Sequence, residues 1–252
     1  MSKNFKKDDW GDYATCYDSL NHLIPYQKLQ KTITKGLGCL SNQTILNAGC
    51  GTGNLEFSLK SIGLDKTCNI WSLDFSEKML EIAEQKLSDS CINFLEVNLN
   101  KKFPFKDNFF DKVFSINSLY ANDVPEFVLK EFYRVMKINS SLILVTPKLG
   151  YQSGLILKEH CGSTKPDEYW LDMHESEEKE ERLTKEAIQD KVVVENMLKI
   201  AKYNREIKRM KKFHFFKKEE ILNLITKCGF AIKELKLVYT KQCFLITAKK
   251  EI

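Results

Sequence analysis

The sequence predicts an α/β fold in which a mostly parallel sheet is covered by helices. Between residues 44 and 146, short β-branched or apolar runs alternate with longer amphipathic ones, the pattern of repeated strand–helix–strand units. The composition agrees with this, because a chain of 252 residues that is 43% hydrophobic and 29% charged suits one substantial domain and excludes disorder. The last two apolar runs are close enough to pair as an antiparallel hairpin.

Seven strands and several helices are expected along the chain. The expected strands span 44–48, 69–74, 92–97, 112–117, 142–146, 232–239 and 244–249. Apolar residues at helical spacing predict helices over 75–87 and 124–136, which should cover the faces of the sheet. A third helix over 217–228 should stop at Gly229, a suitable C-terminal cap.

An insertion is expected over residues 150–212, between the fifth strand and the helix before the sixth. Gly150, Gly154, Gly162 and Pro166 predict loops in its first part. One long charged helix is predicted over 183–213. Acidic residues predominate in 168–186 and basic ones in 199–218, so the layout of charge is more informative than the net charge of +5. Pairing of these two segments with each other is the expected use.

Composition disfavours several other classes of protein. The longest apolar runs, such as 142–145, are far shorter than the roughly 20 residues of a membrane helix, so no membrane span is expected. The N-terminus does not read as a secretory signal, which makes the cytoplasm the expected location. The eight cysteines form no CxxC pair and the four histidines show no ligand spacing, so we expect neither disulfides nor a metal.

The strongest chemical signal is a glycine-rich turn after the first strand. Gly49, Gly51 and Gly53 alternate with other residues and lead into a helix, so a ligand can approach the backbone and the free amides of a helix start. A dinucleotide fingerprint would need its third glycine at Asn54, and no triphosphate-binding GxxxxGK motif is present. With Asp74 ending the second strand and Asn98 following the third, three strand ends predict a site for an adenosine-containing ligand.

These residues resemble the class I S-adenosylmethionine-dependent methyltransferases, particularly the small-molecule type. The resemblance rests on NAGCGTG at 47–53, SLDFSEKMLEIAEQK at 72–86, VNLNKKFPFKDNFFDKVFSINSLY at 97–120, LILVTPK at 142–148 and FKKEEILNLITKCGF at 216–230. It implies a Rossmann-like, doubly wound seven-stranded sheet with one antiparallel strand, S-adenosylmethionine as cofactor, and a small-molecule acceptor. Asn47 and Asn98 depart from the family, which commonly has acids there.

The resemblance also implies which residues hold the cofactor. They are Gly49, Gly51 and Gly53 around its methionine part, Asp74 on the ribose, Phe75 and Met79 on the adenine face, Asn98 and Leu99 on the adenine edge, and Asn117 near the amino acid. Tyr13 and Tyr17, four residues apart on one helix face, resemble a segment that covers the cofactor. They would shield the sulfonium by cation–π contact, and plain packing is the alternative.

Methyl transfer from a sulfonium is an in-line displacement that depends mainly on proximity and exclusion of water, so a dedicated base is optional. The candidates for one are Tyr120, His160 and His174, the two histidines being in the insertion expected to act as a lid. The stretch 117–120 lacks the Asn/Asp-Pro-Pro-Tyr motif of enzymes that methylate nucleobase or glutamine amides. No cysteine follows a proline, which disfavours covalent cysteine catalysis.

Two alternatives to a small-molecule methyltransferase remain open at this point. The first is an RNA or protein methyltransferase that uses the basic stripe at 199–218, although nucleic acid is the less favoured partner. The stripe comprises Lys202, Arg205, Lys208, Arg209, Lys211 and Lys212. The second is a protein that binds the cofactor without transferring methyl. The residues indicate no particular oligomeric state.

Overall fold

The sheet of the protein has seven strands. The computed structural model describes residues 7–35, 37, 40–64, 67–87, 92–171, 173–210 and 213–251. Its strands are β1 (Thr44–Ala48), β2 (Asn69–Asp74), β3 (Ile92–Glu96), β4 (Phe110–Ile116), β5 (Met136–Pro147), β6 (Phe230–Val238) and β7 (Cys243–Lys250). They lie in the order β3-β2-β1-β4-β5-β7-β6. In this order, each strand from β3 to β5 is parallel to the next, whereas β7 is antiparallel to both of its neighbours. This arrangement confirms the predicted fold class.

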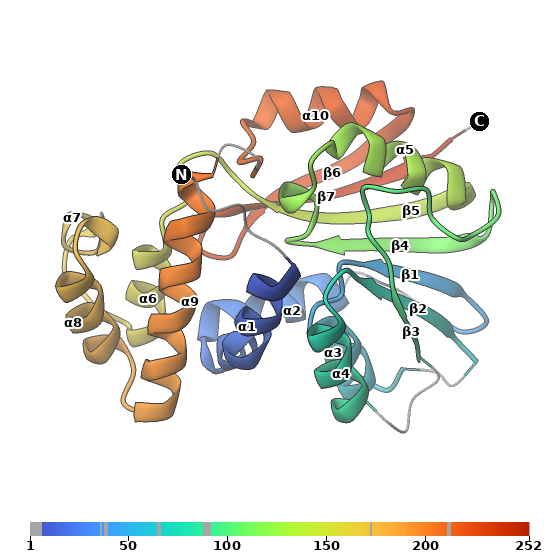
Figure 1. Ribbon diagram of the computed structural model, residues 1–252. Helices are drawn as coiled ribbons and strands as arrows, with labels where there is room; N and C mark the ends of the chain where they lie inside the picture. Colours follow the sequence, from blue (N-terminus) through green and yellow to red (C-terminus); the bar gives the residue numbers. More distant parts are fainter. Residues whose placement is uncertain are drawn as a thin grey trace.

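Helices cover both faces of this sheet (Figure 1). They are α1 (Lys7–Tyr17), α2 (Ile24–Lys35), α3 (Asn54–Ser61), α4 (Glu77–Lys86), α5 (Pro125–Val135), α6 (Ser153–Cys161), α7 (Asp167–Trp170), α8 (Glu177–Ala187), α9 (Lys191–Arg209) and α10 (Lys218–Lys227), with short 3-10 turns η1 (Asp18–His22), η2 (Leu119–Ala121) and η3 (Met173–Glu175). Alternate side chains along a strand point to opposite faces of the sheet. Ile45 therefore packs with α2 and α3, whereas Leu46 packs with α5 and α10.

The insertion differs from its prediction in two ways. The prediction of one long helix over 183–213 is wrong, because a new helix begins after Asp190. The Asp190 carboxylate accepts the N–H groups of Val192 and Val193, and this N-cap separates α8 from α9. The first part, expected as loops, contains α6. Gly154 lies inside that helix, where an added Cβ would come within 1.9 Å of the Trp170 carbonyl oxygen, so this glycine permits close packing.

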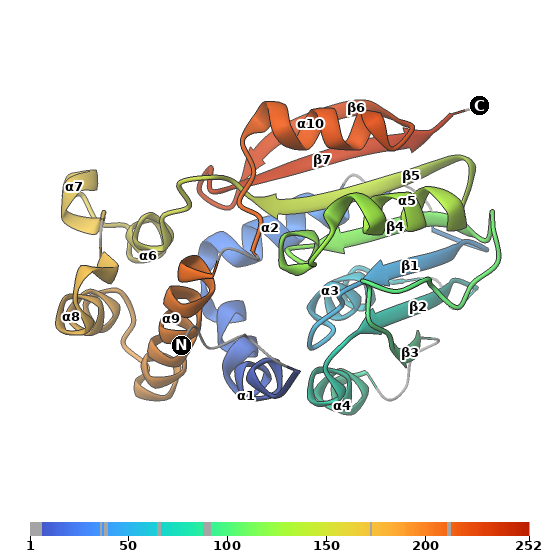
Figure 2. The same ribbon diagram turned by 45° about the horizontal axis from the view of Figure 1, so that its top comes forward.

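The insertion and the N-terminal helix pack together at one end of the sheet (Figure 2). The rings of Tyr13 in α1 and Tyr203 in α9 are 5.3 Å apart and edge-on, and the Tyr13 hydroxyl donates to Asn204 Oδ1 at 3.3 Å. Trp10 contacts Phe213 just beyond α9. This end is the one at which the parallel strands terminate. In the described part of the chain, no helix is long and apolar enough to cross a membrane.

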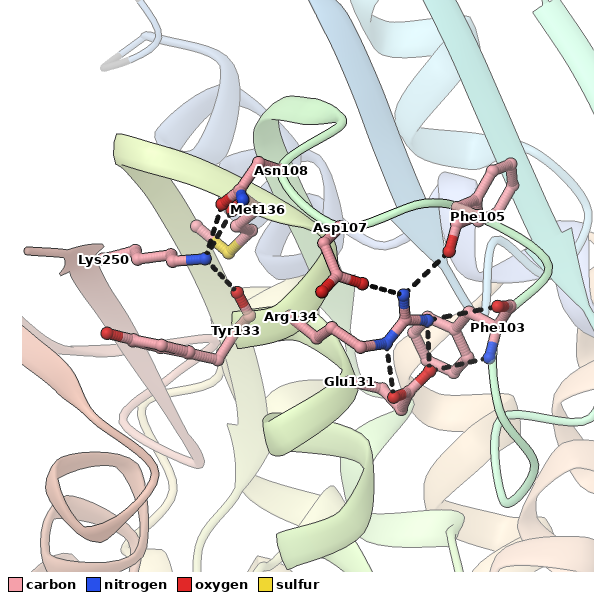
Figure 3. A network of polar contacts seen from close by, with 9 residues as sticks. All are labelled: Phe103, Phe105, Asp107, Asn108, Glu131, Tyr133, Arg134, Met136 and Lys250. Carbon is pink, nitrogen blue, oxygen red and sulfur yellow. Dashed lines mark hydrogen bonds and ion pairs between the residues drawn. The ribbon is translucent and has the colours of Figure 1, made fainter.

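A polar network stabilises the other end of the sheet (Figure 3). Arg134 of α5 donates to both carboxylate oxygens of Glu131, at 2.7 and 2.8 Å, and its remaining N–H groups reach the β3–β4 connection. The acceptors there are the carbonyls of Phe103 and Phe105 and the carboxylate of Asp107. Lys250, at the end of β7, donates to the carbonyls of Tyr133 and Met136 and to Asn108. The network therefore ties the connection, α5 and β7 together.

Replacing Arg134 with Met should lower the free energy of unfolding by about 2 kcal/mol, because Glu131 would stay largely buried without its partner. Burial raises the pKa of Glu131, but hydrogen bonds from Arg134 and Phe103 outweigh it and the net shift is downward. The stabilisation is therefore complete above the ordinary glutamate pKa of 4.5 and is lost as pH falls through the lower folded pKa. Urea unfolding of R134M at several pH values, with exposed Arg182→Met as control, tests this; equal stability of both variants would contradict it.

Candidate active site

The glycine turn is fastened to the end of the neighbouring strand. The N–H groups of Gly49 and Cys50 donate to the Leu73 carbonyl at 2.7 and 2.9 Å, and Gly51 N–H donates to Asp74 Oδ2 at 2.8 Å. Gly49 has a φ of +75°, and an added Cβ would lie 2.1 Å from Ser118 Oγ. Both the left-handed backbone and the close approach therefore require glycine.

A buried carboxylate lies beneath this turn. Glu56 of α3 is inaccessible to solvent, and its Oε1 accepts hydrogen bonds from Asn47 Nδ2 at 2.6 Å and Ser72 Oγ at 2.5 Å. Burial raises the pKa of Glu56, while these two donors lower it. The sequence prediction missed Glu56, because the partners that mark its role come from β1 and β2. Asn47, where the resembling family commonly has an acid, donates here to an acid supplied by α3.

One cavity of about 500 Å³ opens at the strand ends, a size typical of small-molecule sites. It brings together most of the predicted site residues: Tyr13, Tyr17, Gly49, Gly51, Asp74, Phe75, Met79, Asn98, Leu99, Asn117 and Tyr120. The cavity thus extends from the ends of β2 and β3 across to β4. It is also lined by residues that the sequence prediction missed, among them Trp10, Tyr26, Tyr151, Asn204, Phe215, Tyr239 and Cys243.

Two predicted site residues lie outside the cavity, and the side chain of a third is not among the described residues. Gly53 does not line the cavity: it begins α3 with a φ of +75° and packs on α4, where an added Cβ would meet Leu87 at 2.9 Å. His160 also lies outside the cavity, and its Nδ1 accepts the N–H of Ile24 at the start of α2, so the geometry does not place it as a base in this cavity. Burial, followed by nearby His22, lowers the pKa of His160. The backbone of His174 is in η3, and its side chain lies outside the described residues.

The polar groups at the β2 and β3 ends fit an adenosine-containing cofactor. Asp74 accepts the N–H groups of Gly51 and Ser76, and its carboxylate can accept further hydrogen bonds from hydroxyl donors such as those of a ribose. Burial raises the pKa of Asp74, and the backbone N–H groups of Ser76, Gly51 and Phe75 oppose this rise. Asn98 Oδ1 accepts the N–H of Asn100 at 2.9 Å, so its amide hydrogens are the groups that it offers to a ring nitrogen.

A second polar network joins the N-terminal segment to the glycine turn. Asp18 accepts from Thr52 Oγ1 at 2.5 Å and from Lys86 Nζ at 2.9 Å, and the same lysine donates to Asn54 Oδ1. Because Asp18 directly follows Tyr17, this network fixes the aromatic face of α1 over the turn. The Tyr13 and Tyr17 rings are 5.4 Å apart and both face the cavity.

The other half of the cavity is aromatic and carries little charge. Six of the nine tyrosines of the chain line the cavity as a whole. Tyr120 lies between the rings of Phe213 and Phe215, with centroids 5.8 and 5.7 Å away. Among the described residues that line the cavity there is no lysine, arginine or histidine. Nor does the described part of the chain contain a cluster of three side chains placed to hold a metal ion.

Comparison with known proteins shows a likeness to methyltransferases. Residues 46–144 match the family model described as a methyltransferase domain. The crystal structure of an S-adenosylmethionine-dependent methyltransferase from Aquifex aeolicus has the same fold, with a TM-score of 0.57 and 18% identity over 98% of this chain and all of that one. Over residues 46–144 the chain is therefore similar to methyltransferase domains, and its fold is one that an S-adenosylmethionine-dependent methyltransferase adopts.

A curated relative gives a more particular likeness. The chain is 36% identical to the demethylmenaquinone methyltransferase of Oceanobacillus iheyensis over 136 residues, which are 51% of this chain and 56% of the relative. The chain spans about half the length of the curated relatives it matches. The fold also occurs in SpnF, described as a (4+2) cyclase, with a TM-score of 0.58 and 14% identity over 90% of this chain and 81% of that one.

Replacing Asp74 with Asn should weaken S-adenosylhomocysteine binding at least tenfold, because an amide cannot accept hydrogen bonds at all the positions that the carboxylate serves. Calorimetric titration measures the affinity directly. Glu77→Gln is the matched control, since it removes one negative charge from an exposed position three residues away. Equal affinity of D74N and E77Q would contradict the assignment of Asp74 to the ribose.

Proposed function

We propose that this protein transfers a methyl group from S-adenosylmethionine to a small, uncharged acceptor that contains a ring. The observation that carries the proposal is the cavity in which the glycine turn and Asp74 meet an aromatic half that has no lysine, arginine or histidine among its described residues and is formed by α1, α9 and the start of β7. A cofactor and an acceptor placed in its two halves would be adjacent, and the insertion 150–212 would act as the lid over the second half.

The bound cofactor supplies a methyl group on a positively charged sulfur, which leaves as a neutral thioether when the acceptor takes the methyl. The residues of the chain hold the reactants close together and keep water out. Tyr13 and Tyr17 offer ring faces to a cationic sulfur. Burial raises the pKa of Tyr120, so this phenol stays protonated at neutral pH. We therefore assign Tyr120 the role of hydrogen-bond donor to the acceptor, in place of general base.

The lining of the cavity favours a particular kind of acceptor. Because its described residues include no cationic side chain, nothing there would compensate the charge of a phosphate or carboxylate group on the acceptor. Flat aromatic rings would instead pack against Tyr120, Phe215 and Tyr151. The relatives named demethylmenaquinone methyltransferase make a naphthoquinol the first acceptor to test.

The alternative of RNA methylation has less support. Arg205, a member of the basic stripe, is only 13% exposed and forms ion pairs with Glu177 and Glu180 of α8. The acidic segment thus neutralises part of the stripe within the insertion. A largely covered and paired arginine is poorly placed to contact phosphates.

Incubation of the protein with cofactor carrying a tritiated methyl group and with 1,4-naphthohydroquinone, kept reduced under argon, should yield a labelled naphthalene product. Each turnover forms one bond between the methyl carbon and the acceptor, breaks one carbon–sulfur bond and releases one proton. D74N should lose at least 90% of this activity at subsaturating cofactor, whereas E77Q should keep it. The readout is label extracted into organic solvent.

Parallel incubations with a metabolite extract and with total RNA separate the other outcomes. Label in another compound of the extract would support the proposal of a small-molecule methyltransferase and would show that its acceptor is that compound instead of the quinol. Label in RNA would overturn the small-molecule proposal. If calorimetry shows cofactor binding and no mixture contains a labelled product, the protein binds the cofactor but does not transfer its methyl group to these acceptors. A different chemistry is then possible, because the same fold occurs in a cyclase.

A further inference from the structure

The turn between β6 and β7 has an unfavourable backbone conformation. Tyr239, Thr240 and Lys241 follow one another with φ values of +52°, +54° and +60°. Left-handed residues in hairpin turns are normally glycine, asparagine or aspartate, and a β-branched threonine is among the worst choices. In the described part of the chain, every other non-glycine residue with positive φ is an asparagine. The conformation therefore runs against local preference at three successive positions.

Contacts from other segments hold this turn in place. Thr240 Oγ1 donates to Glu159 Oε2 of α6 at 2.7 Å, and Glu159 also pairs with Lys28 of α2. Gln242 is buried: its Nε2 donates to the Thr240 carbonyl, and its Oε1 accepts the N–H of Gln152 at 2.8 Å. Figure 2 shows the turn beside α6. A strained conformation fixed by so many contacts is typical of functional sites.

The strained turn places a tyrosine in the cavity. Tyr239 is 9% exposed, and its ring is edge-on to that of Tyr26, with centroids 6.0 Å apart. The hydroxyls of Tyr239 and Tyr151 share a hydrogen bond, and both residues line the cavity. Together with Cys243 they form its wall at the β7 side. Four strand spacings separate β7 from Asp74 on β2, roughly 19 Å, so this wall belongs to the acceptor half.

We infer that the β6–β7 turn is held in its left-handed conformation to place the Tyr239 hydroxyl against the acceptor, where Tyr239 selects for a ring that bears a neutral oxygen. The inference rests on the proposed function. A hydroxyl in an aromatic wall favours a ring that bears an oxygen over a plain hydrocarbon ring. The oxygen can accept a hydrogen bond from the buried hydroxyl, whereas a hydrocarbon ring would leave that hydroxyl without an acceptor on the ligand. The packing of the Tyr239 ring alone would give no such discrimination.

The test compares two probes in Tyr239→Phe with saturating S-adenosylhomocysteine present. In this variant the Kd of 1,4-naphthoquinone should rise about five-fold, the effect of one neutral hydrogen bond. The Kd of naphthalene, which has the rings and no oxygen, should not change. Both constants are measured by quenching of tryptophan fluorescence. Lys241→Gly is the control: it relieves strain at an exposed turn position, so Tm should rise while both Kd values stay the same.

An unchanged naphthoquinone Kd in Y239F would overturn the inference, as would equal losses for both probes, which would show that Tyr239 only packs. Failure of the unsubstituted protein to bind either probe would overturn it as well. The S-adenosylhomocysteine titration made beforehand distinguishes these results from failure of the proposed function. If that titration shows no binding, the proposed function fails; if it shows binding, only the assignment of Tyr239 falls.

Discussion

The hydrogen bond from Gly51 N–H to the Asp74 carboxylate is the interaction on which the site depends. A left-handed turn after β1 carries N–H groups that no helix or strand of its own can satisfy. The end of β2 supplies the acceptors, with the Leu73 carbonyl for Gly49 and Cys50 and the Asp74 side chain for Gly51. Because β1 and β2 are neighbouring parallel strands, the turn is in effect an extension of the sheet. The turn proposed to hold the cofactor is therefore built on two adjoining strands.

Local patterns were sufficient where the structure depends on local chemistry. β1 and β2 have the bounds predicted from their apolar runs, the first followed by Gly49 and the second ending in Asp74. β7 has the predicted antiparallel direction. The break between α8 and α9 had a local signal that the prediction overlooked: Asp190 is a favourable helix N-cap, as is Ser176, whose Oγ accepts the Lys179 N–H at the start of α8.

Long-range partners decide the features that the sequence could not predict. His160 caps a helix that starts 136 residues earlier in the chain, so nothing near it in the sequence marks that role. Glu56 becomes a support of the turn only through Asn47 and Ser72 on two separate strands. Tyr239 is the extreme case, since its turn contains none of the residues that signal positive φ and is held by α6.

The match to known methyltransferases and the architecture of the cavity divide the chain in the same way. Residues 46–144 run from β1 to β5 and provide the glycine turn, Asp74 and Asn98, which line the half of the cavity proposed for the cofactor. The half proposed for the acceptor is completed by α1, α9 and the β6–β7 turn, all outside that span. A family can thus keep one cofactor chemistry while each member changes its acceptor through segments that the shared domain does not include. On the proposed function, the acceptor of this chain is therefore selected chiefly by the aromatic wall that those segments build.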